Sequence, residues 1–284
     1  MNPVLVAAIL GAVQGVTEFL PISSSGHLKL LEGFLPPTGD ATAFDLALHL
    51  GTLVPVLVTF REDLARMVVD PWRAVTDSGP GGVAGGGTPR PRGWRTAWNR
   101  PGVRWLAWVV LASVPTALIG LALEDVFETH LSGFGALSWQ FAVTARALRH
   151  SGRIAPGTRD VTDMTWRDAL AIGTAQGIAV LPAVSRSGAT IVCALLLGLR
   201  RDVAGSFSFV LSIPAILGAC LLKARTLDPA TIDVAAWATG AAVALVVGWA
   251  SLRFLLRVVQ GGRFQAFAWY CWAMAALCGA LALR

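Results

Sequence analysis

Two interrupted apolar stretches decide the fold of this 284-residue chain. Residues 11–27 read GAVQGVTEFLPISSSGH, and residues 173–189 read GTAQGIAVLPAVSRSGA. Each lies inside a longer apolar segment, 3–34 or 168–199, which Pro, Gly and Ser break in the middle. Neither half of such a segment is long enough to cross ~30 Å of hydrocarbon. The pattern is typical of re-entrant helical hairpins, whose broken backbone is buried in protein or lines a wet cavity.

The rest of the chain supplies unbroken apolar stretches. Apolar residues make up 55% of the sequence and charged residues only 14%, which excludes a disordered chain, a coiled coil and an ordinary soluble enzyme. A membrane span needs about 20 apolar residues. Six stretches meet this requirement, at 41–60, 105–123, 133–149, 204–222, 233–252 and 264–283. We therefore expect an all-α, polytopic integral membrane protein.

The 23 basic residues lie mainly between these spans. They gather in 61–104, 149–167, 200–201 and 253–263, and the first of these segments, rich in Gly and Pro, is predicted to be a flexible loop. Because cytoplasmic loops carry an excess of Arg and Lys, we place all four segments in the cytoplasm and both termini outside. The same pattern explains the basic charge without a nucleic-acid partner, and we expect none.

The two interrupted segments also resemble each other. At a constant offset of 162, six of sixteen positions are identical between 11–26 and 173–188. The charge bias gives the two halves opposite orientations in the membrane. Similarity and opposite orientation together predict two inverted-topology repeats, 1–150 and 151–284, each with one re-entrant hairpin and three spans, which form one membrane domain.

The first hairpin carries an acid, a base and three serines. Gln14 and Glu18 are four residues apart and share one helix face. An unpaired carboxylate in an apolar segment costs about 2.5–3.5 kcal/mol, so Glu18 is a candidate site residue, with a structural ion pair as the alternative. Ser24 and His27 are three apart, close enough to share a cavity, and a serine beside a base is the usual nucleophile arrangement. A hydrogen-bonded core histidine is the alternative for His27.

The second hairpin places Arg186 at its tip, between Ser185 and Ser187, with Thr190 one turn further on. An always-charged Arg in a membrane must meet an anion or water, and its planar fork fits phosphate. The hydroxyls and the N–H groups of a helix N-terminus add donors. The offset sets Arg186 opposite Ser24. An acid and base on one hairpin and an anion clamp on the other favour a phosphate-cleaving site.

Both motifs are similar to those of the bacterial undecaprenyl-diphosphatase family, known for bacitracin resistance. The first is QGVTEFLPISSSGH at 14–27 and the second is PAVSRSGAT at 182–190. The resemblance implies hydrolysis of undecaprenyl diphosphate to undecaprenyl phosphate and phosphate, which recycles the lipid carrier for cell-wall synthesis. It also implies a divalent cation, Mg²⁺ or Ca²⁺, and a multi-pass protein of the bacterial inner membrane whose site opens to the periplasmic side.

The resemblance carries roles to individual residues. Glu18 and His27 become acid/base groups, with Glu18 also associated with the metal, while Ser24 becomes the nucleophile and Arg186 the phosphate clamp. The expected substrate-contacting residues are Gln14, Ser23, Ser25, Ser185, Ser187 and Thr190. Many members of the family have a second Glu where this chain has Gln14.

Several alternatives stay open. Inverted repeats with broken helices are also a transporter architecture, so a transporter or flippase of a polyprenyl phosphate is the main rival. The acid phosphatase superfamily that handles lipid phosphates places a His about five residues after its Ser-Arg pair, and this chain has none there. Asp45 and His49, four apart in the first full span, either support the site or satisfy each other. The oligomeric state is open between a monomer and a homodimer.

Overall fold

The computed structural model describes residues 2–32, 34–35, 41–76, 97–225, 227 and 232–283. Apart from one isolated bridge between Arg159 and Leu199, the regular elements of these residues are helices, which confirms the all-α prediction. They are α1 (Pro3–Thr17), α2 (Ser24–Glu32), α3 (Ala41–Thr59), α4 (Arg61–Thr76), α6 (Pro101–His130), α7 (Phe134–Ser151), α8 (Trp166–Ile178), α9 (Arg186–Leu196), α10 (Arg201–Ala224), α11 (Val234–Gln260) and α12 (Phe267–Ala282), with 3₁₀ turns η1 (Val161–Asp163) and η3 (Phe264–Ala266).

Four of the described helices are long and apolar enough to cross a membrane: α6, α10, α11 and α12 with its preceding 3₁₀ turn. A fifth span results if α3 and α4, bent by 70° at their junction, count as one. The protein is therefore a multi-pass membrane protein, as predicted. The stretch predicted at 133–149 forms α7, whose mean hydropathy is lower than that of the other four because it carries Gln140, Arg146 and Arg149. Its crossing stays a prediction.

The loop predicted at 61–104 is wrong in its first part, because residues 61–76 form helix α4. This segment has Glu62 and Asp63 in its first turn and Arg73 in its last, which complements the helix dipole. The Gly- and Pro-rich run begins only after it. Residues 77–96, with Arg90, Arg92 and Arg95, lie outside the described residues.

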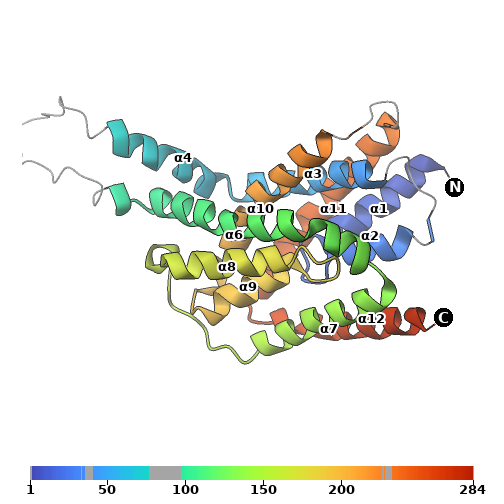
Figure 1. Ribbon diagram of the computed structural model, residues 1–284. Helices are drawn as coiled ribbons and strands as arrows, with labels where there is room; N and C mark the ends of the chain where they lie inside the picture. The colour runs from blue at the N-terminus through green and yellow to red at the C-terminus, as the bar shows by residue number, and fades with distance from the viewer. Residues whose placement is uncertain are drawn as a thin grey trace, which may run out of the picture.

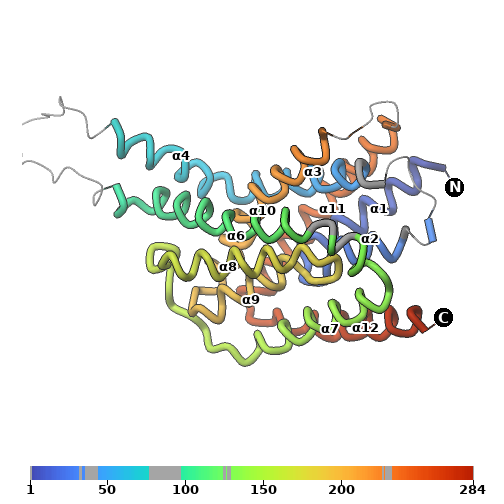
Figure 2. The backbone as a smooth tube through the Cα atoms, viewed as in Figure 1, coloured from blue at the N-terminus to red at the C-terminus, as the bar shows by residue number. Residues whose placement is uncertain are grey.

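The two hairpins predicted at 3–34 and 168–199 are present as α1–α2 and α8–α9. In Figure 1, α1 starts from the end of the molecule that holds both termini, and α8 starts from the opposite end. Figure 2 follows each hairpin to the middle of the molecule and back. The two breaks therefore meet inside the protein. The division into repeats 1–150 and 151–284 stays a prediction.

Close helix packing holds the first arm of each hairpin. A Cβ added at Gly11 would lie 2.4 Å from the carbonyl oxygen of Gly240 on α11, and one added at Gly173 would lie 2.0 Å from that of Ala112 on α6. Only glycine permits so close an approach, which stabilises helix pairs in lipid through backbone contact. Gly11 and Gly173 are partners at the offset of 162, so both hairpins use the same position for this contact.

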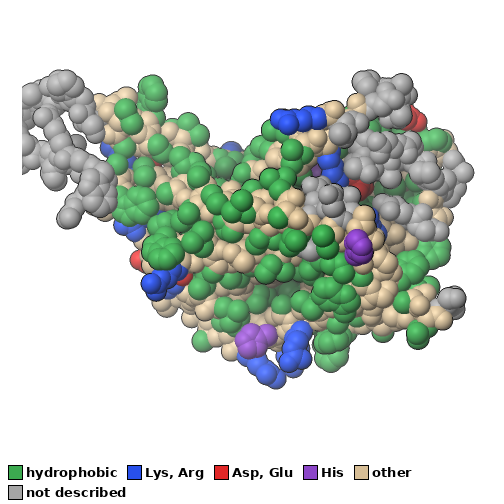
Figure 3. Space-filling model, in the orientation of Figure 1, with side chains coloured by type: hydrophobic (Ala, Val, Ile, Leu, Met, Phe, Trp, Pro, Cys, Tyr) green, Lys and Arg blue, Asp and Glu red, His purple; other side chains and the backbone are tan. Residues whose placement is uncertain are grey.

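The outer surface suits a hydrocarbon environment. Hydrophobic side chains are spread over the whole described face in Figure 3, and most of the charged side chains in view lie toward its edges. Among the most exposed are Leu118, Leu221 and Trp269, at 65%, 69% and 73%. Apolar surface on this scale is expected where lipid, rather than water, surrounds the helices.

Candidate active site

The break in the first hairpin turns the chain between α1 and α2. Helix α1 ends at Thr17, and α2 begins at Ser24. Ser23, just before α2, has a φ of 68°, the only positive φ of a non-glycine residue in the described chain. Its Oγ accepts a hydrogen bond from the N–H of Gly26 at 3.4 Å, which caps the new helix. A strained residue held in this way fixes the direction of the serines that follow.

The break in the second hairpin uses the same cap. Ser185 accepts a hydrogen bond from the N–H of Gly188 at 3.1 Å, at the offset partners of Ser23 and Gly26. Arg186 is the first residue of α9, so its side chain projects from the start of that helix. The equivalent caps set Ser24 and Arg186 at matching positions of the two hairpins.

Serine hydroxyls join the two tips. Both Ser23 and Ser25 donate to the carbonyl oxygen of Pro182, at 2.6 and 2.8 Å. In return, Ser187 donates to the carbonyl oxygen of Phe19 at 3.0 Å. We call these three hydrogen bonds the serine brace. They hold the hairpins together and use the donor hydrogen of each hydroxyl.

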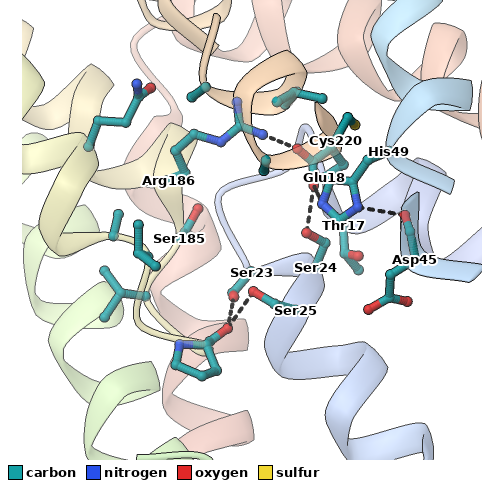
Figure 4. A pocket seen from close by; sticks show the side chains of 18 of the residues that line it. Thr17, Glu18, Ser23, Ser24, Ser25, Asp45, His49, Ser185, Arg186 and Cys220 are labelled. Atoms are coloured by element: carbon teal, nitrogen blue, oxygen red, sulfur yellow. Dashed lines mark hydrogen bonds and ion pairs between the residues drawn. The ribbon is translucent and has the colours of Figure 1, made fainter. Parts of the chain in front are cut away.

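Glu18 is the centre of the polar cluster between the tips (Figure 4). Its carboxylate forms an ion pair with Arg186 and accepts hydrogen bonds from Ser24 Oγ at 2.6 Å and from Gln14 Nε2 at 3.2 Å. The Glu18 side chain is only 4% exposed. Burial of a carboxylate is tolerated when it is paired and hydrogen-bonded, as it is here. The cluster joins an acid and a serine from the first hairpin to a cation from the second.

His49 is the histidine that faces this cluster. Its Nε2 lies 3.7 Å from Glu18 Oε2, and its Nδ1 lies 2.8 Å from the carbonyl oxygen of Asp45. A carbonyl can only accept, so Nδ1 carries the proton and Nε2 points to the carboxylate (Figure 4). The structure thus places His49 at the site, which is one of the two alternatives that the sequence left open for Asp45 and His49.

His27 points elsewhere. Its Nδ1 lies 2.6 Å from the carbonyl oxygen of Ser23, and its Nε2 lies 2.6 Å from the hydroxyl of Tyr270, against which the ring stacks. The edge of Phe141 closes another side. The expected sharing of a cavity by Ser24 and His27 is not found, because both ring nitrogens are engaged with other groups and Ser24 donates to Glu18 instead.

A cavity of about 410 Å³ opens beside the cluster. Of the predicted site residues, it is lined by Glu18, Ser23, Ser24, Ser25, Ser185 and Arg186. Gln14 is buried behind Glu18 and, like His27, is absent from the lining. Ser187 belongs to the serine brace, and Thr190 donates to the carbonyl oxygen of Arg186 at 2.8 Å, one turn back in its own helix. These two hydroxyls therefore face protein.

Sequence reasoning missed the residues that fix the second tip. The N–H of Ala183 donates to Gln140 Oε1 at 2.8 Å, and the N–H of Ser185 donates to Thr144 Oγ1 at 3.1 Å. Gln140 and Thr144 are one turn apart in an otherwise apolar stretch, which was the available signal. Tyr270, the single tyrosine of the chain, carried no such signal.

The described residues do not form a protein-only metal site. No group of three His, Cys, Asp or Glu residues among them could hold a metal ion. Both carboxylate oxygens of Glu18 already accept hydrogen bonds, from Arg186 on one side and from Ser24 and Gln14 on the other. Glu18 could contribute at most one ligand, and the remainder would have to come from the substrate and water.

Comparison with known proteins gives a consistent result. The family model described as bacitracin resistance protein BacA matches residues 7–277. An undecaprenyl-diphosphatase of Desulfosudis oleivorans is 42% identical over 276 residues, 96% of both chains. Those of Rubrobacter xylanophilus and Carboxydothermus hydrogenoformans are 40% identical, over all of both chains, and 37% identical, over 94% of this chain and 93% of the relative. The chain therefore belongs to the bacitracin resistance protein BacA family.

Proposed function

We propose that this protein is a membrane phosphatase that hydrolyses undecaprenyl diphosphate to undecaprenyl phosphate and phosphate. Such a reaction recycles the lipid carrier for cell-wall synthesis and confers bacitracin resistance. Membership of the family and the names of its relatives support the reaction. The observation that carries it is the convergence of Arg186, Ser24 and Glu18, from two hairpins, on one cavity.

Each of the three residues has a defined task in this proposal. Arg186 pairs with Glu18 through Nη2, and the described residues give its other nitrogens no hydrogen-bond partner. Those nitrogens would bind phosphate oxygens and offset their charge. Ser24 Oγ donates to Glu18 at 2.6 Å, so Glu18 can accept its proton when the oxygen attacks the terminal phosphorus. The bond from that phosphorus to the bridging oxygen breaks, undecaprenyl phosphate leaves, and water then hydrolyses the phosphoserine to release phosphate. The same pair could instead orient an attacking water.

Two further residues would act through these. His27 would steady the turn that presents Ser24, because it contacts the carbonyl oxygen of Ser23. Gln14 would orient Glu18 through its hydrogen bond. In the cavity itself, Ser23, Ser25 and Ser185 can still accept hydrogen bonds from a protonated phosphate or from water.

A divalent cation, Mg²⁺ or Ca²⁺, is part of the proposal as a companion of the substrate. Mg²⁺ is commonly held by one or two carboxylates together with substrate phosphates and water, which fits a cavity whose lining has two carboxylates, Glu18 and Asp45. Bound in that way, the cation would neutralise charge on the diphosphate. Activity should therefore fall on treatment with a chelator and return when the cation is restored.

The proposed location is the bacterial inner membrane, with the site open to the periplasmic side. Both termini lie at one end of the molecule, and α4 with its arginines lies at the other (Figure 1). If the arginine-rich end is cytoplasmic, the termini are outside. Beyond the hairpin tips the cavity is lined by Lys29, where α2 returns toward the termini, and by Asp45 near the start of α3. A homodimer is a further expectation, which light scattering in detergent would test.

Phosphate release from undecaprenyl diphosphate by the purified protein tests the reaction. The assay is run in detergent, with and without chelator, and with Ser24→Ala as the control. We expect release by the wild-type protein and loss of release by the variant, which should still bind the lipid. A transporter or flippase would bind the lipid and release no phosphate, and that result would replace the proposal.

A further inference from the structure

The chain contains only two lysines among its 23 basic residues, Lys29 and Lys223. They lie 194 positions apart, on α2 and α10. Both line the same cavity, the one that holds Glu18 and Arg186. Membrane orientation accounts for the arginines of the loops, but it does not account for the presence of both lysines in the lining of one cavity.

Helix geometry directs both lysines toward the cavity beyond the hairpin tips. Lys29 follows Ser25 by four residues, so it shares the cavity face of α2, and it lies about 7.5 Å along the helix from Ser24. Lys223, in the last turn of α10, follows Ala219 by four residues, and Ala219 also lines the cavity. Both side chains are half-buried.

The lining of the cavity contains more basic than acidic side chains. Its acidic, basic and histidine lining residues are Glu18, Asp45, His49, Arg186, Lys29 and Lys223. Glu18 and Arg186 neutralise each other as an ion pair. The remaining fixed charges are one carboxylate and two ammonium groups. Within the described part of the chain, Lys29 makes no ion pair or hydrogen bond.

We propose that Lys29 and Lys223 form a second anion subsite, which binds one phosphate of a diphosphate while Arg186 and Ser24 bind the other. The inference rests on the proposed function and names how its substrate is held. Lysine suits this place because its compact charge sits on a long, flexible stem and can follow a phosphate without a fixed fork.

Two separate sets of donors favour a headgroup with two phosphates over one with a single phosphate. A diphosphate can contact both sets at once. A lipid monophosphate can contact only one set and should bind more weakly. The subsite would therefore help the product to leave after hydrolysis, because one of the two anchoring contacts is lost with the released phosphate.

Chemical modification of the lysines tests the subsite without requiring activity. The purified full chain in detergent is treated with an amine-reactive ester, and mass spectrometry follows the peptides that carry Lys29 and Lys223. A farnesyl methylenediphosphonate, which cannot be hydrolysed, is the probe. At ten times its dissociation constant, we expect it to slow modification of both lysines about tenfold. Farnesyl monophosphonate should protect less, and farnesol should not protect.

Three outcomes would overturn the subsite. In one, the diphosphonate inhibits phosphate release yet leaves both lysines fully reactive. In another, farnesol protects as well as the diphosphonate does, which would show that the hydrocarbon tail merely covers the amines. In the third, the monophosphonate protects equally. If the wild-type protein releases no phosphate but the diphosphonate still protects, the hydrolysis proposal fails and the subsite stands.

Substitution gives an independent measure. Lys29→Met and Lys223→Met should each weaken diphosphonate binding by about tenfold or more, as expected for a lost hydrogen bond to a charged group. Arg225→Met is the matched control, because Arg225 is an exposed basic residue at the end of α10 outside the cavity lining. It should bind as the wild type does. Lysines that only reach the membrane surface would change folded yield and leave affinity unaltered, a result that would contradict the proposal.

Discussion

Replacement of Arg186 separates its contribution to stability from its contribution to catalysis. The Glu18 side chain is 4% exposed and that of Arg186 is 23% exposed, so Arg186→Ala leaves a buried carboxylate without its cation. Loss of one partner of a buried pair costs about 3–5 kcal/mol of folding stability. Turnover should also fall by about 10²–10³, the usual loss for a missing electrostatic donor.

The conservative variant should lose activity with less change in stability. Arg186→Lys keeps a charge for Glu18 but offers one ammonium where the guanidinium offered several nitrogens. It should lose at least one charge-assisted hydrogen bond to phosphate, about 1.5–3 kcal/mol. That corresponds to a fall in kcat/KM of about 10- to 150-fold. Phosphate release from a prenyl diphosphate measures it.

A double variant supplies the control. Arg186→Ala with Glu18→Gln removes both charges, so thermal unfolding in detergent should recover most of the stability lost in Arg186→Ala, while phosphate release stays at least as low as in that single variant. If Arg186→Ala unfolds at the wild-type temperature, the ion pair with Arg186 does not offset the cost of burying the Glu18 carboxylate. If Arg186→Ala hydrolyses the substrate at near the wild-type rate, the phosphatase site lies elsewhere, and the result would favour the hypothesis of a transporter.

Three further predictions follow from the contacts of single residues. Gln14→Ala should reduce turnover much less than Glu18→Gln, because its 3.2 Å hydrogen bond is the longest that Glu18 accepts; equal losses would mean that the pair is structural. Gly173→Ala should cost about 1–3 kcal/mol in thermal unfolding, since its Cβ would lie 2.0 Å from a carbonyl oxygen, whereas Gly133→Ala has open space and should be neutral. In a variant without the four native cysteines, Thr88→Cys should resist an impermeant thiol reagent on intact cells; ready labelling would reverse the orientation.

The hairpins could be predicted because their breaks are local. Pro21 and Pro182 interrupt apolar runs that are otherwise helical, and the caps at Ser23 and Ser185 follow from short-range geometry. Glu18 could be recognised from the cost of a carboxylate among apolar neighbours. The sequence does not, however, specify its partner, since the ion pair joins residues 168 positions apart.

Side-chain direction could not be predicted, because distant contacts decide it. His27 turns to the hydroxyl of Tyr270, 243 positions away, rather than to Ser24 three positions away. Thr190 prefers a backbone acceptor in the preceding turn of its helix, where a bond needs no ligand. The loop predicted over 61–76 is wrong because the run of glycines and prolines that favours a loop begins only after residue 76.

The serine brace has a mechanical consequence. A protein that exposes a site to each side of the membrane in turn must let its two halves move apart around that site. Here such a movement would break the hydrogen bonds of Ser23 and Ser25 to Pro182 and of Ser187 to Phe19. At about 1 kcal/mol for each bond, and more for buried groups left without partners, the separation is opposed before any helix shifts. These hydrogen bonds favour two hairpins that keep their relative position, while the lipid moves into and out of the site.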